Sequence, residues 1–349
     1  MMQEASTPLV TVVTPCYDAE AFVGEAIGSV LAQTYPAVEH VLVDDASTDA
    51  SWSVIERHAA RHPTRIRAVR VERNRGPSHA RNRGVELARG DFLMFLDADD
   101  LITPDTLAAL VDAVRDQPFG IGFCECRGLR RQPDGGWAEV PPEVPVPEPG
   151  ADLVRSFLLH TAWPPTCSTL WRRDAYALTE GYDEQMVRDE DTDLLLHAYL
   201  RGARLVRAGS GVGLYRSFEG ERASVSSGVS EARFRASMRV LDKLAAELER
   251  HGRSAEYADL LSRSYHKAAL HGFQRGFAEP ARECLRRGRA LTGPRVISTH
   301  PVGRFLERLL GLEWKERVAG TLAGLRIATP RRRKALRLES AVRAAEPAP

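Results

Sequence analysis

The fold is decided by the stretch Asp91-Phe92-Leu93-Met94-Phe95-Leu96-Asp97-Ala98-Asp99-Asp100. Its apolar run is short and rich in aromatic residues, which is typical of a buried strand in a parallel sheet. Three carboxylates follow at the carboxyl end of that strand, where open α/β sheets bind their ligands. Strand alternation puts Asp97 and Asp99 on one face, so the pair suits a hard divalent cation that also contacts substrate phosphates. The alternative is a solvated turn that caps a helix beginning near Pro104.

Strand and helix patterns alternate three times before this stretch. We expect strands over residues 9–13, 40–43 and 66–71, and helices over residues 22–31, 51–61 and 78–88. Asp18 is expected to cap the first of these helices. The alternation predicts an α/β fold with a mostly parallel central sheet, right-handed crossovers and helices on its faces.

Acidic residues end three of the expected strands, and a structural role alone explains them poorly because like charges repel. They are Asp18, then Asp44 with Asp45, then Asp97 with Asp99. In a nucleotide site, Tyr17 would cover a base, Asp45 would accept a hydrogen bond from its imide and Asp97 would contact ribose. Asp99 would hold the metal, and Arg81 or Arg83 would add positive charge on the phosphate side. The set indicates a site for a nucleoside diphosphate with bound metal.

The sequence lacks the signature motifs of two other classes of nucleotide-binding protein. The turn after the first strand, Pro15-Cys16-Tyr17-Asp18, contains no G-x-G-x-x-G, and no G-x-x-x-x-G-K-[ST] occurs in the chain. Neither a dinucleotide-binding turn nor a P-loop is therefore expected.

Five short motifs in this order resemble family 2 glycosyltransferases with the GT-A fold. They are residues 13–20 (VTPCYDAE), 29–35 (SVLAQTY), 43–49 (VDDASTD), 80–84 (ARNRG) and 95–100 (FLDADD). The resemblance runs from about residue 9 to 116, and more loosely to residue 216. It implies an inverting transfer of a sugar from a nucleoside diphosphate, helped by Mg²⁺ or Mn²⁺.

The resemblance also implies roles for individual residues. Pro15 and Tyr17 match the first turn that contacts the nucleotide, and Asp45 matches the acid that contacts uracil. Asp97 matches the acid on the ribose side and Asp99 the metal ligand. UDP is the favoured nucleotide, while dTDP and GDP stay open.

Two further acids have less definite roles. Asp18 stands where the family usually has Asn, which leaves its role open. Asp100 is expected either to support the metal ligand or to cap a helix.

A second acidic cluster, Arg188-Asp189-Glu190-Asp191-Thr192-Asp193, lies before an amphipathic helix. An inverting transfer needs a general base for the acceptor hydroxyl, and the Glu190-Asp191 pair resembles the E-D motif whose Asp is that base in the family. We assign Asp191 as the base. The alternative is that these acids only cap the helix and stabilise its dipole.

Several features of the second half carry expectations of their own. Trp163 is expected either to stack on a sugar ring or to lie in the core. The proline-rich residues 141–149 predict an extended loop. Residues 205–206 predict a last short strand, followed by a flexible turn at Gly209, Gly211 and Gly213.

The segment beginning Tyr215-Arg216 lacks the His that follows in many relatives, so Arg216 or Arg222 is expected on the phosphates. The Q-x-x-R-W signature of processive synthases is missing. A polymer-extruding synthase is therefore not expected.

Composition changes after residue 228. We expect a GT-A domain over residues 1–228, with a nucleotide half at about 9–116 and an acceptor half at about 117–228. A helical region follows over residues 229–328, then a basic, disordered tail over residues 329–349. From Ala281 onward, 16 Lys and Arg face 6 Asp and Glu, a net charge of +10. This region is open to roles in acceptor choice, in a homo-oligomer or in peripheral contact with an anionic membrane surface.

Overall composition excludes some classes. Net charge is +1, so no nucleic-acid partner is expected, and 43% of residues are hydrophobic, as in globular proteins. The five cysteines are expected as reduced thiols of a cytoplasmic protein. No apolar run approaches 18 residues and no leader is recognised, so any membrane contact would be peripheral, at the inner face.

The sequence thus predicts a metal-dependent inverting glycosyltransferase. A catalytically decayed GT-A scaffold and a nucleotidyltransferase are the alternatives, although the Gly-rich basic loop of the latter is missing. The donor sugar and the acceptor, whether a glycan, a lipid-linked glycan, a protein or a small molecule, are open.

Overall fold

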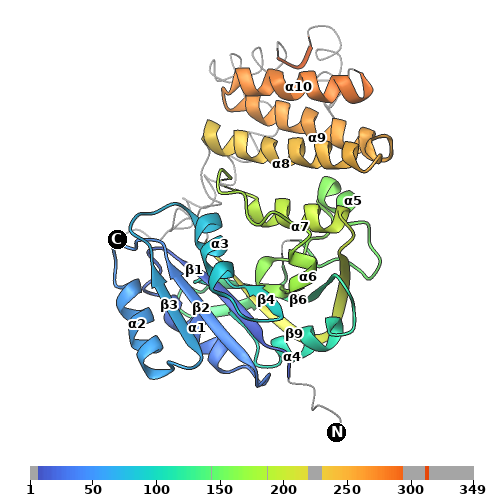
Figure 1. Cartoon of the computed structure of the whole chain (residues 1–349). Helices are drawn as coiled ribbons and strands as arrows, with labels where there is room; N and C mark the ends of the chain where they lie inside the picture. The colour runs from blue at the N-terminus through green and yellow to red at the C-terminus, as the bar shows by residue number, and fades with distance from the viewer. Residues whose placement is uncertain (1–6, 143, 187, 219–229, 294–310, 314–349) are drawn as a thin grey trace, which may run out of the picture. The chain divides into compact units, whose positions relative to one another are not determined.

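The computed structural model describes residues 7–142, 144–186, 188–218, 230–293 and 311–313 (Figure 1). The chain divides into two compact units, residues 1–255 and residues 256–349. The predicted domain boundaries at residues 228 and 328 stay predictions. Arg222 and the basic tail lie outside the described residues.

The first unit alternates strands and helices in its first half. Its elements in chain order are β1 (Val10–Cys16), α1 (Val23–Leu31), β2 (Val38–Asp44), α2 (Ser51–Arg61), β3 (Ile66–Arg70), α3 (Pro77–Leu87), β4 (Phe92–Phe95), β5 (Leu101–Ile102) and α4 (Thr106–Val114). The second half of the unit holds β6 (Gly120–Arg131), β7 (Trp137–Val140), α5 (Leu153–Leu159), a 3₁₀ turn (Thr166–Ser168), β8 (Thr169–Arg172), α6 (Arg173–Tyr176), α7 (Glu190–Leu200), β9 (Arg204–Ser217) and α8 (Glu231–Arg250).

One sheet joins the strands in the order β3-β2-β1-β4-β8-β6-β9-β5, with β7 paired to β6. The pairs β3–β2, β2–β1 and β1–β4 are parallel, which confirms the parallel arrangement predicted from the first hundred residues. Strands β8, β7 and β5 pair antiparallel with their neighbours, while β6 and β9 are parallel. The carboxyl ends of β1, β2 and β4 therefore meet at one edge of the sheet.

Helices cover both faces of this sheet, as strand alternation requires. Leu42 packs in one cluster with Ile27 of α1 and Ile55 of α2. Its neighbours Val41 and Val43 point to the opposite face, where they pack with Ala80 of α3. A third cluster includes residues of β1, β4 and α4. The acidic strand ends are thus presented from a core buried on both sides.

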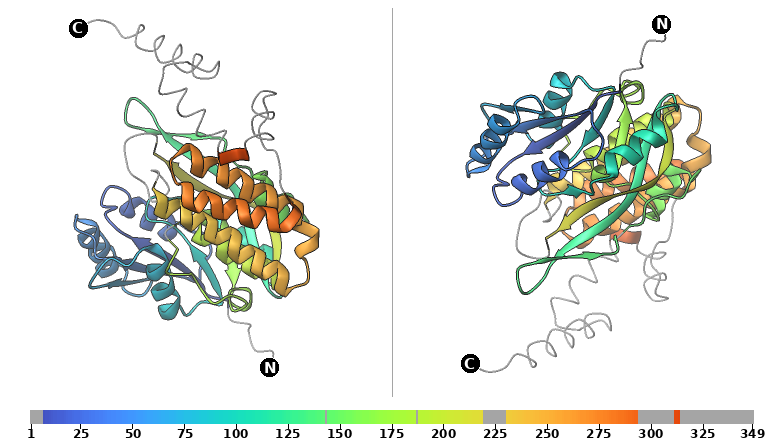
Figure 2. Two further views of the ribbon diagram at one scale, coloured as in Figure 1. Left: turned by 90° about the horizontal axis from the view of Figure 1, so that it is seen from above. Right: turned by 90° about the horizontal axis from the view of Figure 1, so that it is seen from below.

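Strands β6 and β7 form an antiparallel hairpin around residues 133–137. The turn is closed by a hydrogen bond from the Gln132 N–H to the Gly136 carbonyl. The two views of Figure 2 show this hairpin, in green, extending beyond the rest of the sheet. Beyond it, the described residues of 141–149 contain no helix or strand, as the prolines predict.

The prediction for residues 205–213 is wrong. In place of a short strand and a flexible turn, β9 runs for 14 residues through the three glycines. Its register against β6 shifts between Phe123 and Glu125, which marks a bulge. Gly211 has φ +85°, and a Cβ on Gly213 would lie 2.7 Å from the Cys167 carbonyl oxygen. Gly211 and Gly213 therefore serve a bend and a close approach inside a strand.

The second unit contains two long helices in its described part, α9 (Ser254–Gln274) and α10 (Ala278–Thr292). They pack closely, since the Ser262 hydroxyl donates to the Gly288 carbonyl at 2.8 Å. Among the helices described in the chain, none has the length and apolar character needed to cross a membrane. All five cysteines are buried and unpaired.

Candidate active site

The nucleotide side of the candidate site lies at the ends of β1 and β2. Pro15 is buried within β1 beside Val43, and Tyr17, just beyond the strand, is 48% exposed. Asp45 is buried, and its carboxylate accepts hydrogen bonds from the N–H groups of Arg75 (3.1 Å) and Gly76 (2.7 Å). Asp45 therefore holds the loop that leads into α3, beside the exposed Tyr17 ring.

Asp18 does not cap α1, so this prediction is wrong. The helix begins at Val23 and has no side-chain cap. The Asp18 carboxylate instead accepts the Thr48 N–H at 2.7 Å, and Asp18 itself has φ 47°. It ties the turn after β1 to the loop after β2. Asp and Asn tolerate such left-handed conformations better than most residues, which fits the family's Asn at this position.

Arg81 joins the two acidic clusters predicted from the sequence. Its guanidinium donates to Asp97 Oδ1 at 2.6 Å and to Glu190 Oε1 at 2.7 Å. It also lies 5.1 Å from the centre of the Tyr182 ring. Burial lowers the pKa of Arg81, but the charges of Asp97 and Glu190 outweigh burial and raise it well above its usual value. One charged group therefore holds the end of β4 against the start of α7.

The acids after β4 form a crowded group. Ala98 and Asp100 are buried, while Asp97 and Asp99 are only partly buried, as alternation predicts. Burial, followed by the charges of Asp99 and Asp97, raises the pKa of the Asp100 carboxyl well above its usual range. Asp100 Oδ1 accepts the Arg216 N–H at 2.9 Å. Asp100 thus anchors β9, whereas Asp97 and Asp99 remain partly accessible.

This group suits a divalent cation only with help from the substrate. Within the described ranges, no three His, Cys, Asp or Glu side chains are arranged to hold a metal ion by themselves. Asp97 and Asp99 still offer the carboxylate oxygens that Mg²⁺ prefers, and that ion usually completes its shell with phosphate oxygens and water. The donor set therefore fits a metal that arrives with a diphosphate.

Arg216 is buried beneath aromatic rings. Its guanidinium lies 5.2 Å from the centre of the Phe22 ring and 5.0 Å from that of Trp137. It donates to the Asp99 carbonyl at 3.1 Å and pairs with Glu25. Arg216 therefore supports the backbone of Asp99, and its predicted contact with phosphates stays a prediction.

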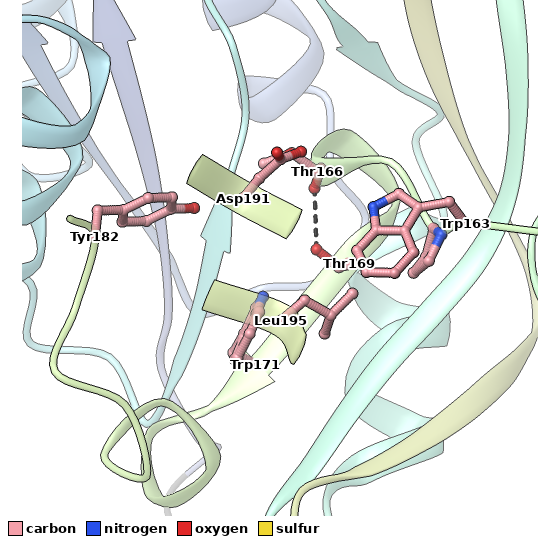
Figure 3. Close-up of a pocket in the computed structure, with 8 residues that line it drawn as sticks. Trp163, Thr166, Thr169, Trp171, Tyr182, Asp191 and Leu195 are labelled. Atoms are coloured by element: carbon pink, nitrogen blue, oxygen red, sulfur yellow. Dashed lines mark hydrogen bonds between the residues drawn. The ribbon is translucent and has the colours of Figure 1, made fainter. Parts of the chain in front are cut away.

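Asp191 lies in the first turn of α7, at the mouth of a small pocket (Figure 3). Its carboxylate accepts the Thr166 hydroxyl at 2.9 Å and the Thr192 N–H at 2.8 Å. Burial, then the neighbouring charge of Glu190, raises the pKa of Asp191 to about 6. A carboxylate with such a pKa is well suited to accept a proton near neutral pH.

Aromatic side chains line the same pocket. Trp163 and Tyr182 lie on opposite sides of Asp191, and Trp171 lies below it with Leu195 (Figure 3). Trp163 is partly buried and packs edge-on against Phe157 at 5.7 Å between ring centres. Trp163 thus contacts Phe157 and also lines the pocket, and its stacking on a sugar ring stays a prediction.

Sequence reasoning missed several partners of these residues. Thr166, Tyr182 and Glu25 had no assigned role, yet each contacts one of the predicted site residues. The charge of Arg81 was expected on phosphates, whereas its side chain is 5% exposed and paired with two carboxylates. A charge count around Glu190 could have indicated that a buried acid there needs a cationic partner.

Comparisons with known proteins agree with this architecture. Residues 11–142 match the sequence model of the family described as Glycosyl transferase family 2. RfbC of Myxococcus xanthus, named an O-antigen biosynthesis protein, is 34% identical over 261 residues, which cover 71% of this chain and 19% of RfbC. EpsJ of Bacillus subtilis, named an uncharacterized glycosyltransferase, is 30% identical over 216 residues, covering 60% of this chain and 61% of EpsJ.

TarS of Staphylococcus aureus, a poly(ribitol-phosphate) beta-N-acetylglucosaminyltransferase, is 27% identical over 274 residues, covering 75% of this chain and 45% of TarS. The chain thus spans less than two thirds of each of these relatives. A crystal structure of TarS 1–349 with UDP-GlcNAc has a TM-score of 0.55 at 22% identity, covering 81% of this chain and 90% of that one. The likeness concerns the fold, and the predicted GT-A fold with C-terminal helices is confirmed.

Proposed function

Since the chain belongs to glycosyl transferase family 2 through residues 11–142, we propose that it transfers a sugar from a UDP-sugar to an acceptor hydroxyl, with inversion at the anomeric carbon. The observation that carries this proposal is the Arg81 bridge. It brings Asp97, on the side expected for the donor, to Glu190, the neighbour of the expected base. This shared partner supports a single site for the donor-side and base-side carboxylates.

In the proposed reaction, Asp191 removes the proton from the acceptor hydroxyl as its oxygen attacks the anomeric carbon. The bond from that carbon to the diphosphate oxygen breaks, and its electron pair leaves with UDP. The raised pKa of Asp191, about 6, keeps the carboxylate ionised at neutral pH while making it a stronger base than an exposed aspartate. Thr166 orients the carboxylate by its hydrogen bond.

On the donor side, Tyr17 covers the base, Asp45 accepts from its imide and Asp97 contacts the ribose. Asp99, with Asp97, would hold a Mg²⁺ or Mn²⁺ ion, which when bound offsets negative charge on the leaving diphosphate. Asp100 and Arg216 hold the backbone of this segment in place. These carboxylates repel one another, and a bound cation would offset that repulsion.

The acceptor approaches the pocket of Asp191, where Trp163 offers an aromatic face to a sugar ring. A glycan acceptor is consistent with the name of RfbC, an O-antigen biosynthesis protein, and UDP-GlcNAc is the first donor to test because TarS binds it.

Calorimetric titration of UDP, GDP and dTDP, each with and without Mn²⁺, tests the donor site. We expect UDP to bind the wild type tightly only with Mn²⁺, and Asp99→Ala to lose at least about tenfold in affinity, or about 1.4 kcal/mol. Asp112→Ala, which removes an exposed carboxylate of α4, is the matched control and should bind as the wild type does.

Failure of all three nucleotides to bind under either condition would refute the donor site and favour a non-catalytic scaffold. Binding that is equally tight without metal would keep the nucleotide site but remove the metal from the proposal. Release of UDP from UDP-GlcNAc in the presence of Mn²⁺ then tests the reaction itself.

A further inference from the structure

The segment that carries Asp191 concentrates negative charge. Asp189, Glu190, Asp191 and Asp193 fall within five residues at the start of α7. Such carboxylates repel one another, and the helix dipole offsets only part of that repulsion. Arg81 pairs with Glu190, and Thr166 donates to Asp191. Arg188 lies 3.5 Å from Asp189 and the His197 ring lies 3.2 Å from Asp193, and α8 supplies further partners for both acids.

Helix α8 contacts the segment on both sides of Asp191. The Ser237 hydroxyl donates to Asp189 Oδ2 at 3.0 Å, before the base. The Lys243 ammonium pairs with Asp193, after the base, and also donates to Asp183 Oδ2 at 3.1 Å. Figure 1 shows α7 and α8 side by side within the first unit.

Lys243 therefore links two parts of the chain. One nitrogen joins the loop before α7 to the first turn of α7, and these partners are ten residues apart. Arg239, one helical turn earlier, adds a second bond to Asp183 at 2.9 Å. The Asp193 side chain is only 5% exposed, so its pairing is weakly screened by solvent.

We propose that Lys243 is a positioning residue that holds Asp191 in register with the donor site. The proposal rests on the proposed function. It gives a role to α8, which lies outside residues 11–142, the part matched by the family model. A general base must lie within hydrogen-bond reach of its proton, and a misplacement of about 1 Å costs roughly 100-fold in rate.

The test compares Lys243→Met with the wild type, using UDP release from UDP-GlcNAc and calorimetric binding of UDP with Mn²⁺. Methionine keeps much of the side-chain length and removes the charge. We expect kcat to fall by at least about tenfold, while the Kd for UDP stays within about twofold. Hydrogen exchange should accelerate over residues 183–193 and stay unchanged over α2, which packs on the face of the sheet opposite α3.

Three variants control this result. Lys243→Arg should restore kcat to within about threefold, since guanidinium can also bridge two carboxylates. Arg235→Met, on the same helix, removes a partner of Glu231 and should leave kcat and exchange unchanged. The double variant Asp193→Asn/Lys243→Met has no buried, unpaired charge at position 193, so it should fold and still show low kcat.

A folded Lys243→Met, or the folded double variant if the single one fails to fold, with wild-type kcat would overturn the proposal. Unchanged exchange over residues 183–193 would overturn it as well, and this measurement needs no substrate. If the wild type releases no UDP while exchange accelerates in Lys243→Met, Lys243 does hold the segment of residues 183–193. The proposed function, and not this contact, is then refuted.

Discussion

In the proposed mechanism, the acceptor's proton is removed by one carboxyl group, that of Asp191. Burial and Glu190 raise its pKa to about 6, whereas the Thr166 hydrogen bond acts in the opposite direction. A base must be ionised to act, so we expect kcat to fall about tenfold per pH unit below pH 6. Thr166→Val removes the stabilising hydrogen bond and should move this acidic limb to higher pH. If the acidic limb of the pH profile does not move in Thr166→Val, that limb does not report the ionisation of Asp191.

Replacement of Asp191 by Asn should lower kcat and raise the free energy of unfolding above pH 6. We expect kcat to fall by about 100-fold to 10,000-fold. The folded pKa lies above the unfolded value, so the stability that the protonated group contributes is present at low pH and lost as pH rises through about 6. At pH 8 the variant should therefore be more stable by about 1–3 kcal/mol, and at pH 4 the difference should nearly vanish. Urea denaturation at both pH values measures this.

At the scale of elements, β9 requires glycine at particular positions. A Cβ on Gly213 would lie 2.7 Å from the carbonyl oxygen and 2.9 Å from the carbonyl carbon of Cys167, and this backbone cannot move aside easily. We expect Gly213→Ala to lower the free energy of unfolding by about 1–3 kcal/mol. Gly209 lies in the same strand with open space around it, so Gly209→Ala should change stability by less than about 0.5 kcal/mol. Equal losses in the two variants would contradict the packing argument.

At the scale of the first unit, Arg81 connects residues that are distant in sequence. Arg81 reaches Glu190 and Asp97 through two separate nitrogens, Nη1 and Nη2, of one planar guanidinium. The single nitrogen of the shorter lysine should not reach both, so Arg81→Lys should leave one of these carboxylates without its partner. We expect a loss of about 3 kcal/mol in the free energy of unfolding, measured by urea denaturation. Arg83→Lys, on the same helix, alters only an exposed pair with Glu86 and should cost less than about 0.5 kcal/mol. Wild-type stability in Arg81→Lys would show that the bridge is dispensable.

The parts of the fold that depend on local pattern were predictable. Helix α2 occupies the predicted residues 51–61, and the strands at residues 9–13, 40–43 and 66–71 occur within about three residues of their predicted ends. Periodicity reports which side chains face a core, so it works where an element packs on a regular surface. It failed in β9, because glycines often end a strand, whereas in β9 Gly213 allows a close approach to Cys167 and Gly211 to Thr106.

The sequence by itself determined the family, the parallel half of the sheet and the identity of the candidate acids, since each depends on residue types at short spacing. Only the tertiary structure decided which of these residues meet. Arg81 pairs with Asp97, 16 residues away, and with Glu190, 109 residues away. Lys243 reaches Asp193 across 50 residues. The physical reason is that the packing of distant segments decides which group becomes the partner of a buried charge. Residue types at short spacing do not specify that packing.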